Sequence, residues 1–494
     1  MSERAAIIGA GANELVAAHL LSRAGWKVVV LDSRAEDDPS TTTLGWVVPH
    51  IARELDLGRH GLQSMHADPW ITVPVDGAAR LDLWRDATRS AESIRRFSPA
   101  DAARWPVFCE RMAIVARALE ALVSTAPPDP LADGIGELTG LAGLALRLRR
   151  LGRQGIEDLL RFVPMPIADL LDDWFECDAL KGALGAAGIL HLQQGPRSGG
   201  TALNFLHQQL GGPGGVFRAP RSNVEEVLAS LPGIEIRRSV RVARISVRAH
   251  RVTGVALASG EEIAAPLVLC GADPRRTLLE LLEPGWLEPE AVRAVRRIRS
   301  RGVVAQVLLE LDREPGFTTL AVAPSLDDLE RAYDDAKYGR ISRAPYLEAS
   351  AGGKSVRVHV QYAPYALADG TWDEVQRDRL VDLVVRALDR SVPGLSKTVV
   401  SRRALAPPDL EARFGWPQGQ MHHAELALDQ WLWMRPIPEL ARYRTPISGL
   451  YLCGAATHPG AFVPGSSGYH AARQALKDAR DPPREISSRI SRGK

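Results

Sequence analysis

Cysteine is scarce in this chain, and the few cysteines present form no recognisable pair. Only four occur in 494 residues, and none of them belongs to a CxxC motif: Cys109, Cys177, Cys270 and Cys453. This spread argues against a zinc site or a disulfide scaffold and is typical of a reducing compartment. We therefore expect a cytoplasmic protein that has no metal site.

An excess of charge of one sign is also lacking. The formal net charge is only +2, so nothing in the overall charge points to a nucleic-acid partner. The motifs GxSxG, HExxH and the P-loop do not occur, which argues against the hydrolase, metalloprotease and nucleotide-hydrolase chemistries that depend on them.

Long hydrophobic runs are missing as well. No stretch of about 18 uncharged apolar residues occurs, so we expect no membrane-spanning helix, and "MSER" leads directly into a short apolar segment unlike a secretory leader. The stretch "LTGLAGLALRLRRLGRQG" (138–155) is apolar and then basic. We interpret it as a surface helix with a solvated basic end. The alternative is an interfacial helix that makes peripheral membrane contact.

The N-terminus contains a complete βαβ pattern. "AAIIGAG" predicts a buried strand and a glycine turn, "ANELVAAHLLSRAG" a helix that ends at Gly25, and "WKVVVLD" a second buried strand. Gly9 would make the tight turn, and Gly11 would let the backbone approach a pyrophosphate at the helix N-terminus. Asp32, at the end of the second strand, would accept hydrogen bonds from an adenosine ribose. This context makes the short GxG motif a strong indication of a dinucleotide site.

Glu14 departs from this pattern, because it stands where the third glycine of the fingerprint belongs. In one interpretation it is a tolerated acid of the first helical turn that points outward and interacts favourably with the helix dipole. In the other it lies close to the pyrophosphate position and weakens or abolishes dinucleotide binding. Arg34 is the only basic residue close behind Asp32, and the Gly-Gly pair usual there in flavoproteins is missing.

The C-terminal part carries a longer signature. "HHAELALDQWLWMRP" (422–436) and "YRTPISGLYLCGAATHPGAFVPGSSGYHAARQAL" (443–476) resemble the end of the phytoene-desaturase-like branch of the FAD-dependent amine-oxidase superfamily. Within that branch the chain most resembles the pyridine-nucleotide-disulfide oxidoreductase domain proteins. The segments "ELDLGRHGL" (54–62), "LLDDWFECDALKGALGAAGI" (170–189) and "LVLCGADPRRTLLELL" (267–282) match as well, so the resemblance covers nearly the whole chain.

The resemblance implies FAD as the cofactor and places several residues at the flavin or the adenine. It puts the helix that starts at Gly465–Gly468 and the "CGAATHPG" loop against the flavin, and the backbone of Val242 against the adenine. His458 is the one catalytic candidate. The candidate cofactor-binding residues are Gly9, Gly11, Asn13, Glu14, Asp32, Ser33, Arg34, Val242, Gly454, Ala455, Gly465, Ser467 and Gly468.

The predicted fold is α/β, with a Rossmann-type FAD-binding domain and a second domain of mixed sheet and helices for the substrate. The first would comprise residues 1–65, 223–297 and 440–480, and the second residues 66–222 and 298–439. We expect a dehydrogenase or desaturase that takes hydride from a largely apolar small molecule. The alternative is a degenerate flavoprotein that serves as a scaffold or as the partner subunit of an active paralogue. A homo-oligomer is a further expectation, and a dehydrogenase that uses only NAD(P) would leave the C-terminal signature without a role.

Overall fold

The computed structural model describes residues 3–35, 43–75, 79–127, 142–146 and 148–481. The protein has two structural halves, and the half that contains the N-terminus is built on a five-stranded parallel sheet in the order β18-β12-β1-β2-β8. The strands are β1 (Arg4–Ile8), β2 (Lys27–Leu31), β8 (Glu235–Arg237), β12 (Leu267–Cys270) and β18 (Leu450–Leu452). Because helices and strands cover both faces of this sheet, its strands are continuous apolar runs, as the sequence predicted.

Each face of the parallel sheet has its own cover. On one face, α1 (Ala12–Arg23) packs on Ala5, Ile7, Val28 and Val30, and it is joined there by α10 (Val224–Ser230) and α15 (Ser466–Arg480). On the other face lies an antiparallel sheet of β9 (Val242–Arg248), β10 (Arg251–Leu257) and β11 (Glu262–Ala264), followed by η1 (Arg276–Glu280) and α11 (Pro289–Arg297). The β10–β11 hairpin turns at "ASGEE", as expected from the alternation of apolar and polar residues.

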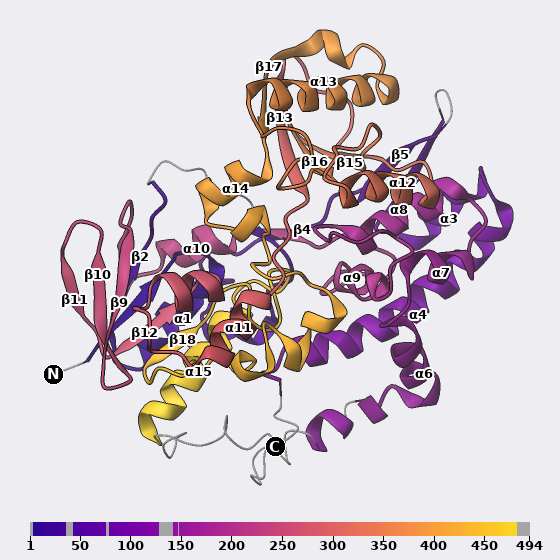
Figure 1. Ribbon diagram of the computed structural model, residues 1–494. Coiled ribbons are helices and arrows are strands. Elements are labelled where there is room, and N and C mark those ends of the chain that lie inside the picture. The colour runs from indigo at the N-terminus through magenta and orange to yellow at the C-terminus, as the bar shows by residue number, and fades with distance from the viewer. Residues whose placement is uncertain (1–2, 36–42, 76–78, 128–141, 147, 482–494) are drawn as a thin grey trace.

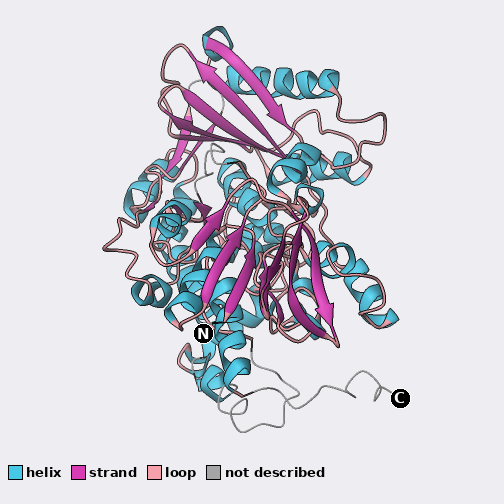
Figure 2. Cartoon of the chain, turned by 90° about the vertical axis from the view of Figure 1, so that its left-hand side faces the viewer, coloured by secondary structure: helices cyan, strands magenta, loops and turns pink. Residues whose placement is uncertain are grey.

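The second half contains a seven-stranded mixed sheet in the order β17-β13-β16-β15-β14-β5-β6. Figure 2 shows the two large sheets as separate groups of strands, one above the other. One face of the seven-stranded sheet is apolar and packs on α13 (Glu374–Ser391). The strands are β5 (Ile71–Pro74), β6 (Arg80–Leu83), β13 (Val304–Leu311), β14 (Thr319–Val322), β15 (Leu347–Gly352), β16 (Ser355–Gln361) and β17 (Val399–Leu405).

A group of helices packs beside this sheet (Figure 1). The aromatic core of this group includes Trp105, Phe108 and Phe217. These helices are α3 (Ala87–Arg95), α4 (Pro99–Val123), α6 (Gly152–Phe162), α7 (Ile167–Asp172), α8 (Asp178–Ile189), α9 (Thr201–His207) and α12 (Leu326–Lys337). A small sheet of β3 (Thr43–Leu44), β7 (Arg221–Ser222) and β4 (Ser64–Met65) joins the two halves. Two short helices complete the fold, α2 (Pro49–Glu54) and α14 (Pro407–Phe414).

The predicted α/β fold class is confirmed, and the five parallel strands lie within the segments predicted for FAD binding. The domain boundaries themselves stay a prediction, and β7 crosses one of them, because it pairs with β3 and β4 of the N-terminal segment. None of the helices in the described ranges is long and apolar enough to span a membrane. Residues 138–141 and 147 of the basic segment lie outside the described residues, so the interfacial-helix alternative also stays a prediction.

Candidate functional site

A cavity of about 970 Å³ lies between the two halves. This volume is at the upper end of the range of small-molecule sites. The cavity reaches from the glycine turn between β1 and α1 to the face of the seven-stranded sheet that α13 does not cover. Nine of the predicted cofactor-binding residues line it: Gly9, Gly11, Asn13, Glu14, Asp32, Ser33, Arg34, Val242 and Ala455.

The glycine turn has the predicted backbone. Gly9 has a φ of +99°, in the left-handed region that favours glycine, and its N–H donates to the Leu31 carbonyl at 2.8 Å. Gly11 is the N-cap of α1, and a Cβ added to it would lie 2.7 Å from Glu14 Oε2. A helix N-terminus suits an anionic group, but here the Ala12 N–H already donates to Glu225 Oε1 at 3.3 Å, so a bound phosphate would have to share or displace that carboxylate.

Glu14 does not point outward, so that interpretation is wrong. Its side chain is buried and lies between the glycine turn and the loop after β12, where a Cβ added to Gly271 would come within 2.0 Å of Glu14 Oε1. Burial, together with the nearby Glu225 carboxylate, raises the pKa of Glu14 to about 7. The carboxyl group therefore stands at the anion-binding end of α1 and is only partly ionised at neutral pH.

We expect Glu14→Gln to tighten FAD binding in a pH-dependent way. The ionised carboxylate would repel the pyrophosphate by about 1–4 kcal/mol at contact distance, whereas the amide keeps the shape without the charge. The dissociation constant of the parent protein should rise as the pH increases through 7, and that of the variant should stay nearly flat. Flavin-fluorescence titrations at pH 6 and pH 8 measure this. Equal pH dependence in both proteins would show that Glu14 does not oppose the phosphates.

Asp32 is buried and already has two basic partners. It accepts from Arg34 Nε at 3.1 Å and from Arg238 Nη1 at 2.9 Å, while Arg34 Nη2 also donates to the Ala10 carbonyl at 2.8 Å. Arg34 thus links the end of β2 to the glycine turn. Sequence analysis missed Arg238 because it follows β8, which becomes a neighbour of β2 only in the folded sheet.

Asp32→Asn is expected to weaken FAD binding about tenfold. A charge-assisted hydrogen bond to a ribose hydroxyl contributes about 1.5–3 kcal/mol, and the amide keeps the shape but loses the charge. The matched control is Asp158→Asn, another buried aspartate paired with an arginine, Arg111, but outside the cavity. An FAD dissociation constant that changes equally in both variants would mean that Asp32 acts only through stability.

The predicted flavin contacts near the C-terminus mostly hold α15 in place rather than line the cavity. A Cβ on Gly468 would lie 1.7 Å from the Asn13 carbonyl of α1, and one on Gly465 would lie 2.9 Å from Val16 Cγ2. A Cβ on Gly454 would meet the Gly271 carbonyl at 2.0 Å. Ser467 Oγ donates to the His458 carbonyl at 3.0 Å. A side chain at Gly468 would therefore meet the backbone of α1 before anything in the cavity.

His458, the predicted catalytic residue, does not line the cavity. It is fully buried outside the cavity lining, and its Nε2 lies 3.3 Å from the Leu122 carbonyl of α4. Burial lowers its pKa to about 3. A neutral ring enclosed in this way has no path to a substrate in the cavity, so the structure gives no support to His458 as an acid or base.

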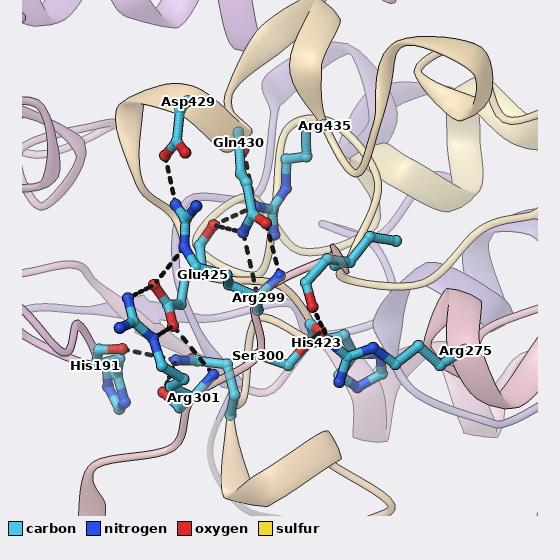
Figure 3. Close-up of polar contacts among 12 residues, drawn as sticks. His191, Arg275, Arg299, Ser300, Arg301, His423, Glu425, Asp429, Gln430 and Arg435 are labelled. Carbon is cyan, nitrogen blue, oxygen red and sulfur yellow. Dashed lines mark hydrogen bonds and ion pairs between the residues drawn. The ribbon is translucent and has the colours of Figure 1, made fainter. Parts of the chain in front are cut away.

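A buried arginine fixes the loop that forms one wall of the cavity (Figure 3). Arg435 donates to six carbonyl oxygens. Figure 3 labels two of these partners, Glu425 and Gln430. Two others are the carbonyls of His422, at 3.0 Å, and Ala455, at 2.7 Å. Nearby, the buried Glu425 carboxylate lies between Arg301, at 2.6 Å, and Arg299, at 3.5 Å. These contacts join segment 422–435 to the "CGAATHPG" loop and so fix the position of Ala455.

The polar face of the seven-stranded sheet lines the other end of the cavity, although none of its residues was among the predicted site residues. Along β16, Arg357 and His359 line the cavity, whereas Val358 and Val360 belong to the opposite, apolar core. His359 pairs with Gln306 of β13 and Glu348 of β15, and both of these also line the cavity. The signal was present in the alternation "VRVHVQ", which places every second, polar residue on one face.

One buried ion pair lies on this face. Arg218 Nε donates to Glu348 Oε2 at 2.8 Å, and the Tyr346 hydroxyl donates to the same oxygen at 2.5 Å. Burial alone would raise the pKa of Glu348, but the Arg218 guanidinium holds it below its usual value. The inner cavity therefore contains an ionised Glu348 carboxylate whose negative charge is already balanced by Arg218.

His422 and His423 are adjacent in the chain but have different surroundings. They lie in a turn, where His423 has a φ of +58° and lines the cavity. His422 is buried behind it and accepts a hydrogen bond from the Ala461 N–H at 3.3 Å. The turn therefore places His423 at the cavity and His422 in the packing behind it.

The sequence profile of the family described as "Flavin containing amine oxidoreductase" matches residues 150–476. The chain belongs to this family. It is 30% identical to pyridine nucleotide-disulfide oxidoreductase domain-containing protein 2 of Rattus norvegicus, over 97% of this chain and 94% of that protein. It is 24% identical to a neurosporene-forming phytoene desaturase of Cereibacter sphaeroides, over 98% and 96% of the two chains. Among solved structures, wild-type putrescine oxidase bound to putrescine has the same fold, with a TM-score of 0.56 and 13% identity over 97% and 99% of the chains.

The predicted family resemblance is thus confirmed, and the chain is an FAD-dependent oxidoreductase. Three features of the cavity suit FAD: the glycine turn at Gly9, the N-terminus of α1 and the acid Asp32 at the end of β2. Several buried polar atoms of its lining residues have no hydrogen-bond partner within the described part of the chain and are available to a ligand, among them Asn13 Oδ1, Trp70 Nε1 and Gln208 Nε2. Glu14 and Glu225 both place a carboxyl group at this end that opposes a pyrophosphate, and Glu225 Oε1 accepts from the Ala12 N–H at 3.3 Å.

Proposed function

We propose that the protein removes a hydride from a C–H bond of a small, largely apolar molecule, which includes a C–H bond next to a nitrogen. When bound, FAD accepts that hydride, which is the chemistry of the cofactor itself. The observation that carries the proposal is the continuity of the cavity, which joins the dinucleotide turn at Gly9 to the sheet of the second half. A substrate on that sheet and a cofactor on the turn would therefore share one continuous space.

The residues of the chain would bind, orient and exclude water. Leu410, Phe414 and Trp416 give the cavity an apolar wall at one side, and Phe462 gives it another. Asp32 and Arg34 would hold the nucleotide end. No side chain of the site is required to move a proton, because hydride removal leaves proton release to the substrate or to water.

The proposal is tested by mixing flavin-loaded protein anaerobically with a panel of apolar amines, alcohols and alkenes and following the visible flavin absorbance. We expect at least one compound to bleach the flavin. If none does while dithionite bleaches it completely, the non-catalytic role, as scaffold or partner subunit, takes the place of the enzyme.

Location and assembly belong to the same proposal. The four cysteines are all free thiols, which supports a reducing compartment such as the cytoplasm. One relative, 23% identical over 96% of this chain and 94% of its own length, is named as a subunit of the limonene dehydrogenase of Castellaniella defragrans. Its name supports a test for pairing with a paralogue, alongside a test for a homo-oligomer, by size measurement of the purified protein.

A further inference from the structure

We infer that the substrate carries an anionic oxyacid group, a carboxylate or a phosphate, on its apolar skeleton. The structure assigns the binding of this group to Arg221 and Arg357 at the mouth of the cavity. The inference rests on the proposed function in one respect, since it takes the cavity as the substrate site.

The two arginines come from different sheets and meet at one place. Arg357 of β16 pairs with Ser350 of β15, and in an antiparallel pair such residues project from the same face. Arg221 of β7 reaches this position from the small sheet, and its Nη2 donates to Ser350 Oγ at 2.8 Å. Both arginines and Ser350 line the cavity. Two guanidinium groups and a hydroxyl therefore surround one point of the wall.

Among the residues that the structure describes, no carboxylate neutralises these two charges. Within the described part of the chain, neither Arg221 nor Arg357 forms an ion pair. Glu348, one row deeper on the same face, is already paired with Arg218. Glu310, one row outward, accepts from Ser355 Oγ at 2.7 Å and 2.8 Å. Partial burial and the positive charges of Arg221 and Arg413 lower the pKa of Arg357, which is the effect of unneutralised neighbouring cations.

The surroundings of the arginine pair are apolar on one side. Leu308 of β13 pairs with Arg357, and α14 brings Leu410 and Phe414 to the cavity wall. Figure 1 shows α14 between the sheet that contains β13 and the half that contains α1. A guanidinium pair beside aliphatic and aromatic side chains matches an amphiphilic acid. It does not match an uncharged hydrocarbon, which would leave both charges unpaired, nor an amine, which they would repel.

The experiment compares probes that share one apolar chain and differ only in the head group: decanoate, decyl phosphate, decanol and decylamine. Binding to the purified protein is measured by isothermal titration calorimetry. We expect at least one of the two acids to bind about tenfold or more tightly than decanol and decylamine, because charge-assisted hydrogen bonds to a guanidinium are the strong ones. The order of decanoate and decyl phosphate then identifies which oxyacid the site takes.

Arg357→Met and Arg221→Met should each remove most of this preference. The matched control is Arg403→Met, because Arg403 of β17 belongs to the same row of the sheet, beside Leu308, but does not line the cavity. All three arginines are exposed, so the substitutions should leave the melting temperature unchanged. Equal affinity for the four probes, tighter binding of decylamine, or a preference that survives both substitutions would overturn the inference. A preference for acids in a protein whose flavin is never reduced would instead refute the proposed function alone.

Discussion

Replacing Gly468 with alanine or valine is expected to destabilise the fold by about 3 kcal/mol or more, with any loss of cofactor a consequence of that damage. An added Cβ would overlap the Asn13 carbonyl, at 1.7 Å, and the backbone of α1 can give way only if α15 moves. Overpacking of this kind typically costs about 1–3 kcal/mol and sometimes more. Helix propensity acts in the opposite direction, because glycine is the poorer helix former.

Urea unfolding of both variants measures the effect, and alanine is the decisive one, since its side chain ends at the overlapping atom. The matched control is Gly143→Val, at another helical glycine, where nothing lies within 4 Å of an added Cβ. This control should be neutral or slightly stabilising. A Gly468→Ala variant that unfolds like the parent protein but loses its flavin would restore the steric role next to the cofactor.

Lowering the pH from 7 to 5 is expected to cost about 5 kcal/mol or more of unfolding free energy. Burial lowers the pKa of His207, His458 and His470 to about 3 and that of His423 to about 4. Since the unfolded value is about 6.5, the unfolded chain binds more protons below that pH. Each histidine then removes about 1.4 kcal/mol per pH unit, starting at about pH 6.5 and continuing towards its folded pKa.

Protonation of the buried acids changes the unfolding free energy in the opposite direction. The raised pKa of Glu14, about 7, means that the folded state binds the extra proton, so this group stabilises the fold as the pH falls below 7. Glu225 and Asp273, whose pKa values burial also raises, contribute in the same direction. Burial also lowers the pKa of His191 and His422, so the histidines that destabilise the fold at low pH outnumber these acids. The net expectation is therefore loss of stability.

Urea titrations at pH 7, 6 and 5 on protein of equal flavin content give the slope. His470→Gln should reduce it by about 1.4 kcal/mol per pH unit, while His60→Gln, at an exposed histidine, should leave it unchanged. Constant stability between pH 7 and pH 5 would show that these rings take up protons in the folded protein.

The local parts of the fold could be predicted from the sequence, because local patterns determine them. The strand, glycine turn and helix around Gly9 depend on residues close together in the chain, and so does the alternation in β16. The orientation of Glu14 could not be predicted, since the loop at Gly271 that encloses it is brought there only by the pairing of β1 with β12. The contact between Asp32 and Arg238 could not be predicted either, because it forms only when β2 pairs with β8.

The C-terminal motif shows the limit of transferring roles by resemblance. Its spacing correctly identified the family, but spacing does not say which atoms a glycine lets approach. At Gly468 the neighbour is α1, and at Gly454 it is the Gly271 carbonyl. Ala455, in the same motif, does line the cavity, because the Arg435 guanidinium binds its carbonyl.

The central claim is that this cavity holds FAD despite Glu14. The most direct test is to purify the protein after expression with ample riboflavin, record its visible absorbance, denature it and identify any released cofactor by mass. The account predicts a yellow protein that releases FAD in an amount close to one per chain. A colourless protein that releases none, and that binds none when FAD is added at pH 6, where Glu14 is mostly protonated, would contradict it.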